Sequence, residues 1–151
     1  LPELIGNNFD FDMSRQSIFG HSMGGHGALI IALRNPKNYK SCSAFAPIVE
    51  PSTASWSSEA FKKYIGPNKK DWEKYDSVAL IRDGFYFPEI LVDQGEADSF
   101  LDEGLRPWLL QEICRKSKIN LKLRMQSGYD HSYFFISTFM SDHLMWHKER
   151  I

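Results

Sequence analysis

The 151-residue sequence has little of several features that mark specialised classes of protein. It has only two cysteines, Cys42 and Cys114, which are too few for a disulfide framework and suit a reducing compartment. Its 18 basic residues are balanced by 19 acidic ones, so the basic excess of a nucleic-acid-binding protein is absent. No apolar run approaches the ~20 residues that cross a bilayer, and the first residues do not read as a signal peptide. We therefore expect a globular protein of the cell interior, without a nucleic-acid or membrane partner.

The composition is that of one ordinary folded domain. Hydrophobic residues make up 42% and charged residues 25%, near the averages for globular proteins. Phe, Tyr and Trp together reach 14% and recur in groups at 85–87 and 133–135. We expect most of these rings in the core, because buried aromatic side chains contribute strongly to packing. The alternative is an aromatic-walled cleft.

Runs of strand character alternate with runs of helical character. The expected strands cover residues 17–20, 41–46, 89–93 and 120–125, the last alternating in polarity as an edge strand does. Expected helices end near residues 34, 116 and 149, and Pro107 predicts a kink or a late start in the second of them. This order predicts an α/β fold, a mostly parallel sheet with helices on its faces and ligands at its carboxyl edge.

The stretch 51–83 has a different character, with Ser and Thr at its start followed by Lys and Asp. We expect it to form a surface insertion with short helices near 58–65 and 77–81. The excursion is not a linker, so the prediction is a single domain over residues 1–151.

The sequence Gly20-His21-Ser22-Met23-Gly24 stands between an expected strand and an expected helix. In that context G-x-S-x-G predicts a nucleophilic serine on a strained turn. We expect both flanking glycines to be needed because side chains there would collide with backbone, while Gly25 and Gly27 would let the helix pack closely. The helix N-terminus favours an oxyanion, and the N–H of Met23 would donate to it.

A serine nucleophile needs a base and an orienting acid, in the order Ser, Asp or Glu, His. Three acids follow the third expected strand, at Asp93, Glu96 and Asp98. Asp98 is favoured because it lies past the glycine, on the loop, where its carboxylate can reach a histidine. Asp93 and Glu96 stay open as alternatives.

The expected base is His131, within the glycine-led loop that joins the last strand to the last helix. His21 and His26 lie too close to the serine in sequence and are expected to pack around its turn. His143 and His147, spaced i, i+4 on a helix, could hold a metal, but no third ligand is evident. For this pair we expect a solvated or packed face.

Ser22, Asp98 and His131 together predict a serine hydrolase. His131 takes the proton of Ser22, whose oxygen attacks an acyl carbonyl, and then protonates the leaving group before water repeats the sequence. Asp98 fixes the tautomer of the imidazole. This chemistry requires no metal and no organic cofactor.

Four segments in order resemble the S-formylglutathione hydrolase (esterase D) family. They are Gly20-His21-Ser22-Met23-Gly24-Gly25-His26-Gly27-Ala28, Ser43-Ala44-Phe45-Ala46-Pro47-Ile48, Asp93-Gln94-Gly95-x-x-Asp98-x-Phe100-Leu101 and Gly128-Tyr129-Asp130-His131-Ser132-Tyr133. The resemblance implies an α/β-hydrolase fold and a cytoplasmic thioesterase that hydrolyses S-formylglutathione to glutathione and formate in formaldehyde detoxification. It also implies carboxylesterase side activity, a homodimer as a candidate assembly, and the same roles for Ser22, Asp98 and His131.

The sequence departs from the family pattern at positions that bear on substrate preference. Val49-Glu50 replaces the usual Cys-Asn, and Gly104 stands where glutamine is common. Four expected strands, against about eight in the family fold, suggest the carboxyl-terminal half of that fold, with an unpaired edge at the nucleophile strand. We then expect the isolated chain to self-associate or to need its other half. The alternatives are a carboxylesterase or acyltransferase of the same fold, and an inactive fragment that only binds a partner.

Overall fold

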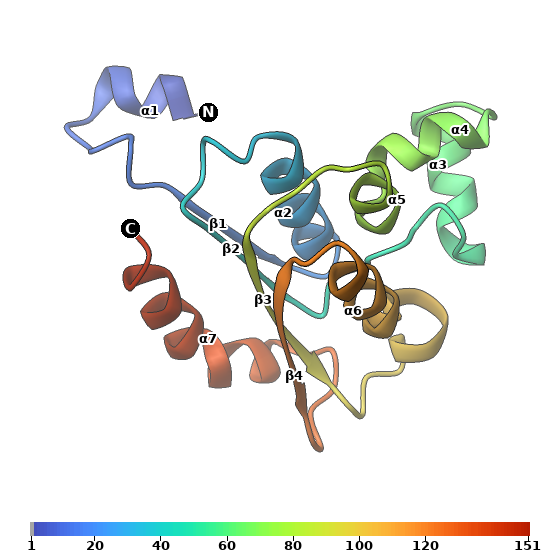
Figure 1. Cartoon of the computed structure of the whole chain (residues 1–151). Helices are drawn as coiled ribbons and strands as arrows, with labels where there is room; N and C mark the ends of the chain where they lie inside the picture. Colours follow the sequence, from blue (N-terminus) through green and yellow to red (C-terminus); the bar gives the residue numbers. More distant parts are fainter. Residues whose placement is uncertain (1) are drawn as a thin grey trace.

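Four parallel strands form the sheet of this protein, whose computed structural model describes residues 2–151 (Figure 1). The spatial order is β1-β2-β3-β4, and each strand pairs in parallel with the next. The register aligns His21 with Phe45 and Phe45 with Asp93, so the carboxyl ends of three strands meet at one edge. The strands are β1 (Ser17–His21), β2 (Ser41–Phe45), β3 (Glu89–Gly95) and β4 (Asn120–Gln126).

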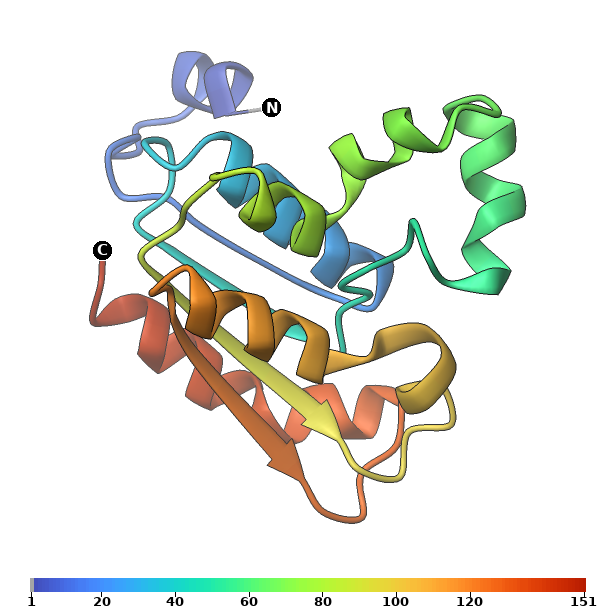
Figure 2. The same cartoon turned by 45° about the vertical axis from the view of Figure 1, so that its right-hand side comes forward.

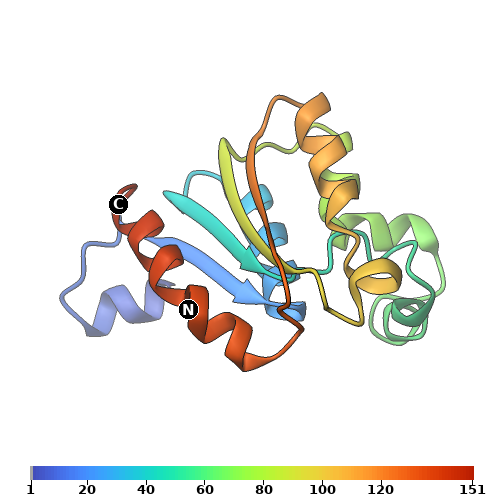
Figure 3. The same ribbon diagram turned by 90° about the horizontal axis from the view of Figure 1, so that it is seen from below.

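Helices cover both faces of this sheet (Figures 2 and 3). On one face α2 packs against β1 and β2, α6 packs against β4, and α5 contacts both helices. On the other face α7 lies across β2 and β3. The α-helices are α1 (Pro2–Asn8), α2 (Met23–Arg34), α3 (Ser58–Tyr64), α4 (Lys69–Trp72), α5 (Ser77–Arg82), α6 (Pro107–Lys116) and α7 (Tyr133–Lys148).

The expected alternation of strands and helices is confirmed, with β4 as an edge strand. The helix expected to end near residue 116 is preceded by a separate helical turn. Residues Leu101–Leu105 form a π-helical turn, Arg106 adopts a left-handed conformation, and α6 begins at Pro107. Proline is well suited to a first helical position because it has no N–H to lose there. The late start predicted from Pro107 is therefore what the chain adopts.

The segment from 51 to 83 contains both exposed and buried helices. Short 3₁₀ turns at Ser55–Ser57 and Glu73–Tyr75 flank α3 and α4, which lie away from the sheet (Figure 2). By contrast, α5 is buried along most of its length, through Val78, Ala79, Leu80 and Ile81. Asp76 caps α5 by accepting a hydrogen bond from the Ala79 N–H at 2.8 Å. The segment 51–83 is therefore exposed at α3 and packs into the core at α5.

The main apolar core lies between the sheet and the helices α2, α5 and α6. Alternate residues of β2 and β3 point into it, as the two-residue period of a strand requires. These are Cys42 and Ala44 from β2, with Ile90 and Val92 from β3. Complete burial raises the pKa of the Cys42 thiol, and burial raises that of Cys114 to about 12, so both side chains act as small apolar groups.

The opposite face of β2 carries serines, and α7 supplies histidines that bind them. His147, 4% exposed, has Nδ1 2.7 Å from Ser41 Oγ and Nε2 2.7 Å from Ser43 Oγ. His143 Nδ1 lies 2.8 Å from the same Ser43 hydroxyl. Of the solvated or packed face expected for these histidines, the structure shows the packed one, and serine hydroxyls hydrogen-bond to both histidines.

The buried His147 predicts an acid-sensitive fold. Burial lowers the pKa of His147 from 6.5 to about 4, helped by the neighbouring His143 and Arg150 charges. The unfolded chain therefore binds this proton first, and stability falls as the pH drops from about 6.5 towards 4. Between pH 7.5 and pH 5 we expect a loss of about 2 kcal/mol that a His147→Gln variant does not show. Urea denaturation at both pH values measures the difference, and equal pH dependence in the two proteins would contradict it.

β1 is an edge strand, with no pairing partner on its outer side in the part of the chain described. An apolar groove of about 730 Å³ lies beside it, with Ile18 and Ile31 among its lining residues. The unpaired edge expected at the nucleophile strand is thus present. Over residues 2–151, every helix is too short or too polar to cross a membrane.

Candidate active site

Ser22 occupies the sharp turn between β1 and α2. Its backbone has φ 55° and ψ −114°, a conformation that costs a non-glycine residue of order 1–3 kcal/mol and is held only by its surroundings. The Ser22 N–H donates to the Phe45 carbonyl at 2.9 Å, which ties the turn to the end of β2. α2 begins at the next residue, Met23, so free N–H groups of its first turn lie beside the serine.

Close backbone approach explains two glycines of this turn. A Cβ on Gly20 would lie 2.3 Å from the Gly24 carbonyl oxygen, and one on Gly25 would lie 3.1 Å from Pro47 Cβ. The expectation fails at Gly24 and Gly27, where a Cβ would meet nothing within 4 Å. At those two positions a side chain would meet open space, and the close contacts fall on Gly20, against the first turn of α2, and on Gly25, against Pro47 and the end of β2.

His131 and Asp98, which lie on different loops, are hydrogen-bonded. His131 Nδ1 is 2.6 Å from Asp98 Oδ2, and the Asp98 side chain has no solvent exposure. Two further donors hold the carboxylate, the Phe100 N–H at 2.9 Å and Gln94 Nε2 at 3.1 Å. Burial alone would raise the pKa of Asp98, but the hydrogen bonds from His131 and Phe100 outweigh it and lower the pKa.

The charge on Asp98 determines the tautomer of His131. A carboxylate only accepts hydrogen bonds, so Nδ1 of His131 must carry the hydrogen and Nε2 of the neutral ring keeps its lone pair. The ring is packed between two others, with centroid distances of 4.5 Å to His21 and 5.2 Å to Phe100. Its orientation is therefore determined on three sides.

The alternative acids have other environments. Asp93, at the end of β3, is fully buried and forms a bidentate ion pair with Arg124. Burial would raise the pKa of Asp93, but hydrogen bonds from His143 and Arg124 outweigh it and lower the pKa. Glu96 is exposed on the turn after β3. Neither carboxylate is hydrogen-bonded to His131.

The two histidines beside the serine pack around its turn, as expected. His26 Nδ1 lies 3.2 Å from the Ile48 carbonyl oxygen. The His21 ring packs against the His131 ring at an interplanar angle of 43°, and its buried Nε2 has no partner among the described residues. Burial lowers the pKa of His21, and the nearby His131 lowers it further. The neutral form of the His21 ring is therefore favoured.

Ser22 and His131 line the same pocket, whose volume is about 340 Å³. Its other walls are mainly apolar and come from three separate segments of the chain. They are Met23, Ile48, Trp56, Phe100 and Leu105. The size suits a small acyl group, and the apolar walls suit one without charge.

Apart from Met23, these pocket walls were not among the site residues expected from sequence. The aromatic groups at 85–87 and 133–135 divide between core and surface instead, since Phe87 and Phe135 are buried while Tyr133 is 85% exposed. Trp56 and Phe100 are the aromatic walls of the pocket, so a partly aromatic cleft exists but uses isolated rings. The one available signal was that Phe100 lies two residues after Asp98.

Comparison with known proteins places this geometry in a family. Residues 1–146 match the model of the Esterase family, which is described as "Putative esterase". The chain belongs to the Esterase family. The S-formylglutathione hydrolases of Paracoccus denitrificans and Mus musculus are 50% and 51% identical to it, over 100% and 99% of its length respectively. The chain spans 54% of each of these relatives, about half of their length.

A solved structure extends the likeness to three dimensions. The S-formylglutathione hydrolase from Agrobacterium tumefaciens superposes with a TM-score of 0.96 at 63% identity, covering 99% of this chain and 54% of that one. This Esterase-family chain therefore has an α/β-hydrolase fold. It contains a parallel sheet with helices on both faces and spans about half of the length of the relatives. The fold class expected from sequence is confirmed.

Proposed function

We propose that this chain carries the catalytic triad of a serine thioesterase that hydrolyses S-formylglutathione to glutathione and formate. The observation that carries the proposal is the 2.6 Å hydrogen bond between His131 and Asp98 at a pocket that Ser22 also lines. The names of the relatives at about 50% identity support the substrate. The Met23 N–H, at the start of α2, is the proposed oxyanion donor.

The proposed reaction has two halves. His131 Nε2 takes the hydroxyl proton of Ser22 while the serine oxygen attacks the thioester carbonyl. The resulting tetrahedral oxyanion accepts a hydrogen bond from the Met23 N–H. His131 then protonates the departing sulfur, which releases glutathione and leaves formyl-Ser22. In the second half water takes the place of the serine hydroxyl, and formate leaves as the Ser22 proton returns. Asp98 stabilises the imidazolium that forms in each half.

The pocket has room for a small acyl group. A formyl group has no carbon beyond its carbonyl, and it fits easily in about 340 Å³ between Ile48, Trp56 and Leu105. Simple esters with short acyl groups fit the same space, which supports carboxylesterase side activity.

The test compares thioester with aryl-ester turnover by the protein containing this chain. We expect kcat/KM for S-formylglutathione to exceed that for p-nitrophenyl acetate by about 10-fold or more, because binding of the glutathione part adds to transition-state stabilisation. Equal or reversed values would contradict the substrate assignment and favour a general carboxylesterase. We place the reaction in the cytoplasm, as one step of formaldehyde detoxification, and propose a homodimer as the assembly.

A further inference from the structure

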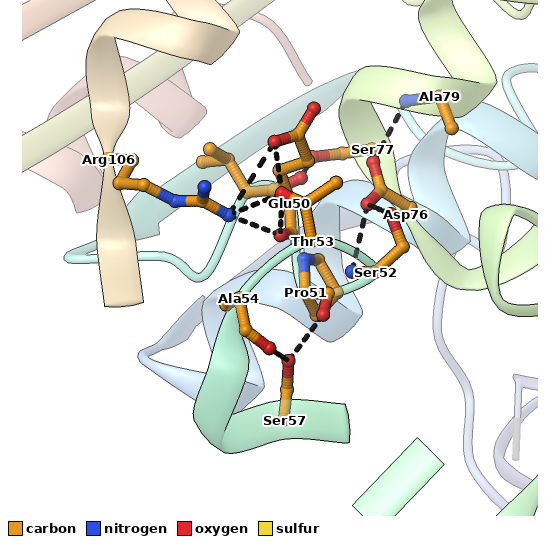
Figure 4. A network of polar contacts seen from close by, with 11 residues as sticks. Glu50, Pro51, Ser52, Thr53, Ala54, Ser57, Asp76, Ser77, Ala79 and Arg106 are labelled. Atoms are coloured by element: carbon orange, nitrogen blue, oxygen red, sulfur yellow. Dashed lines mark hydrogen bonds and ion pairs between the residues drawn. The ribbon is translucent and has the colours of Figure 1, made fainter. Parts of the chain in front are cut away.

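Two separate segments contribute walls to the pocket. Polar contacts join these segments, and the residues that make the contacts are drawn in Figure 4. The segment 47–57, after β2, carries Ile48 and Trp56, and the π-helical turn at Leu101–Leu105 supplies Leu105. We call the contact between them the Glu50–Arg106 clamp, formed by Glu50, Thr53 and Arg106. The walls are therefore coupled by side chains that do not themselves line the pocket.

The clamp is a closed set of hydrogen bonds. Arg106 Nη2 donates to the Glu50 carbonyl oxygen at 2.6 Å and to Thr53 Oγ1 at 2.9 Å, and it lies 3.5 Å from Glu50 Oε2. Thr53 Oγ1 in turn donates to the Glu50 carboxylate. Both charged side chains are only 18% exposed, so the pair is screened less than an ion pair on the open surface.

The backbone conformation of Arg106 also indicates that its side-chain contacts matter. Its φ of 47° and ψ of 54° are left-handed, a conformation that favours glycine or asparagine and costs arginine about 1–2 kcal/mol. The Arg106 N–H closes the π-helical turn by donating to the Leu101 carbonyl at 2.9 Å. An arginine here is explained by its side-chain contacts, since its backbone conformation is unfavourable.

Trp56 rests on the same turn. A Cβ on Gly104 would lie 2.9 Å from Trp56 Nε1, so the indole contacts the turn where a side chain is absent. Any movement of the turn would therefore shift both Leu105 and the support of Trp56. The segment before Trp56 is fixed on its other side, because buried Asp76 accepts the Ser52 hydroxyl at 2.6 Å (Figure 4).

We infer that the Glu50–Arg106 clamp is a positioning device that sets the width of the pocket and thereby the length of the acyl group accepted. Glu50 and Arg106 are positioning residues, because they act through Trp56 and Leu105 and do not contact the reacting atoms. With the clamp intact the walls stay close and short acyl groups are favoured. The inference rests on the proposed serine hydrolysis at Ser22.

The test measures acyl-chain selectivity in the protein containing this chain. The principal variant is Arg106→Asn, which removes the guanidinium and tolerates a left-handed backbone, so the turn retains its fold. For this variant we expect a change in the ratio of two kcat/KM values, that for p-nitrophenyl hexanoate divided by that for p-nitrophenyl acetate. The ratio should rise about 5- to 10-fold, because an apolar pocket distinguishes acyl groups that differ by a few methylenes. Glu50→Gln keeps an oxygen acceptor for Arg106 and Thr53 and should raise the ratio less than Glu50→Ala.

Two measurements separate loss of the clamp from loss of any ion pair and from partial misfolding. Glu112→Ala removes an exposed 2.6 Å ion pair with Lys116 and should leave the ratio unchanged. Fluorophosphonate titration of Ser22 counts the active molecules of each variant, so a poorly folded fraction cannot alter the ratio. An unchanged ratio in titratable Arg106→Asn and Glu50→Ala, with the unaltered protein active, would overturn the clamp alone. If the unaltered protein hydrolyses no ester and Ser22 is not labelled, the result contradicts the proposed function and also the inferred role of the clamp.

Discussion

Replacement of Ser22 by alanine is expected to reduce kcat by about 10⁵- to 10⁶-fold, the largest effect of any single change in this protein. The reason is that the reaction then has no nucleophile, and water attacks directly without an acyl-enzyme intermediate. Only the oxyanion donor and substrate binding would still lower the barrier. The measurement is S-formylglutathione turnover by the protein containing this chain, with and without the substitution.

A matched serine separates this loss from a general effect of the change. Ser58 is half-buried and its hydroxyl donates to the Ser55 carbonyl oxygen at 2.8 Å, and it does not line the pocket. Ser58→Ala should keep near-normal turnover. Mass spectrometry after fluorophosphonate treatment should show labelling of Ser22 in both the unaltered protein and Ser58→Ala, and none in Ser22→Ala. Turnover by Ser22→Ala above about 1% of normal would show that another group is the nucleophile.

Replacement of Asp98 by asparagine is expected to reduce kcat by about 10⁴-fold. The asparagine is nearly isosteric, but its NH₂ group can donate to His131 Nδ1, which then becomes the acceptor. The hydrogen would move to Nε2, and the ring could no longer take the Ser22 proton. KM should change little, because Asp98 does not line the pocket.

Other carboxylates provide the controls for Asp98. Asp130 precedes the histidine but accepts a hydrogen bond from the Ser132 N–H at 3.0 Å and is not hydrogen-bonded to the ring, so Asp130→Asn should change kcat only a few-fold. Glu96→Gln, on the exposed turn, should have as little effect. Asp93→Asn should act on stability, because it leaves the Arg124 guanidinium without its buried partner. If Glu96→Gln reduced kcat as much as Asp98→Asn, the choice of Asp98 would be wrong.

Local patterns were sufficient to predict the strands and helices near the site. Gly20, Ser22 and the apolar residues around them predicted the strand, turn and helix that β1 and α2 form. Pro107 predicted the late start of α6. These features depend on neighbours in the chain, through helix propensity, turn geometry and the missing N–H of proline. Such interactions are visible in a short window of sequence.

The surroundings of Asp98 and His131 needed the folded chain. Parallel strands bring their carboxyl ends to one edge, which predicts that loops after β3 and β4 approach each other. That rule selects candidates but does not say that Gln94 and Phe100 would hold the carboxylate, or that the His21 ring would pack against the imidazole. These contacts join residues far apart in the chain, and their geometry depends on sheet register and loop conformation.

Chain order and residue type were enough to indicate the α/β architecture, the strained serine and the chemistry of a hydrolase. The pocket walls, the serine-bound histidines of α7 and the Glu50–Arg106 clamp came from packing. Trp56 faces the pocket because Gly104, 48 positions later, has no side chain to displace it. Arg106, in a left-handed backbone conformation, binds Glu50, which lies 56 positions earlier in the chain. Periodicity records which face of an element is buried, and only the assembled layers determine what each buried side chain meets.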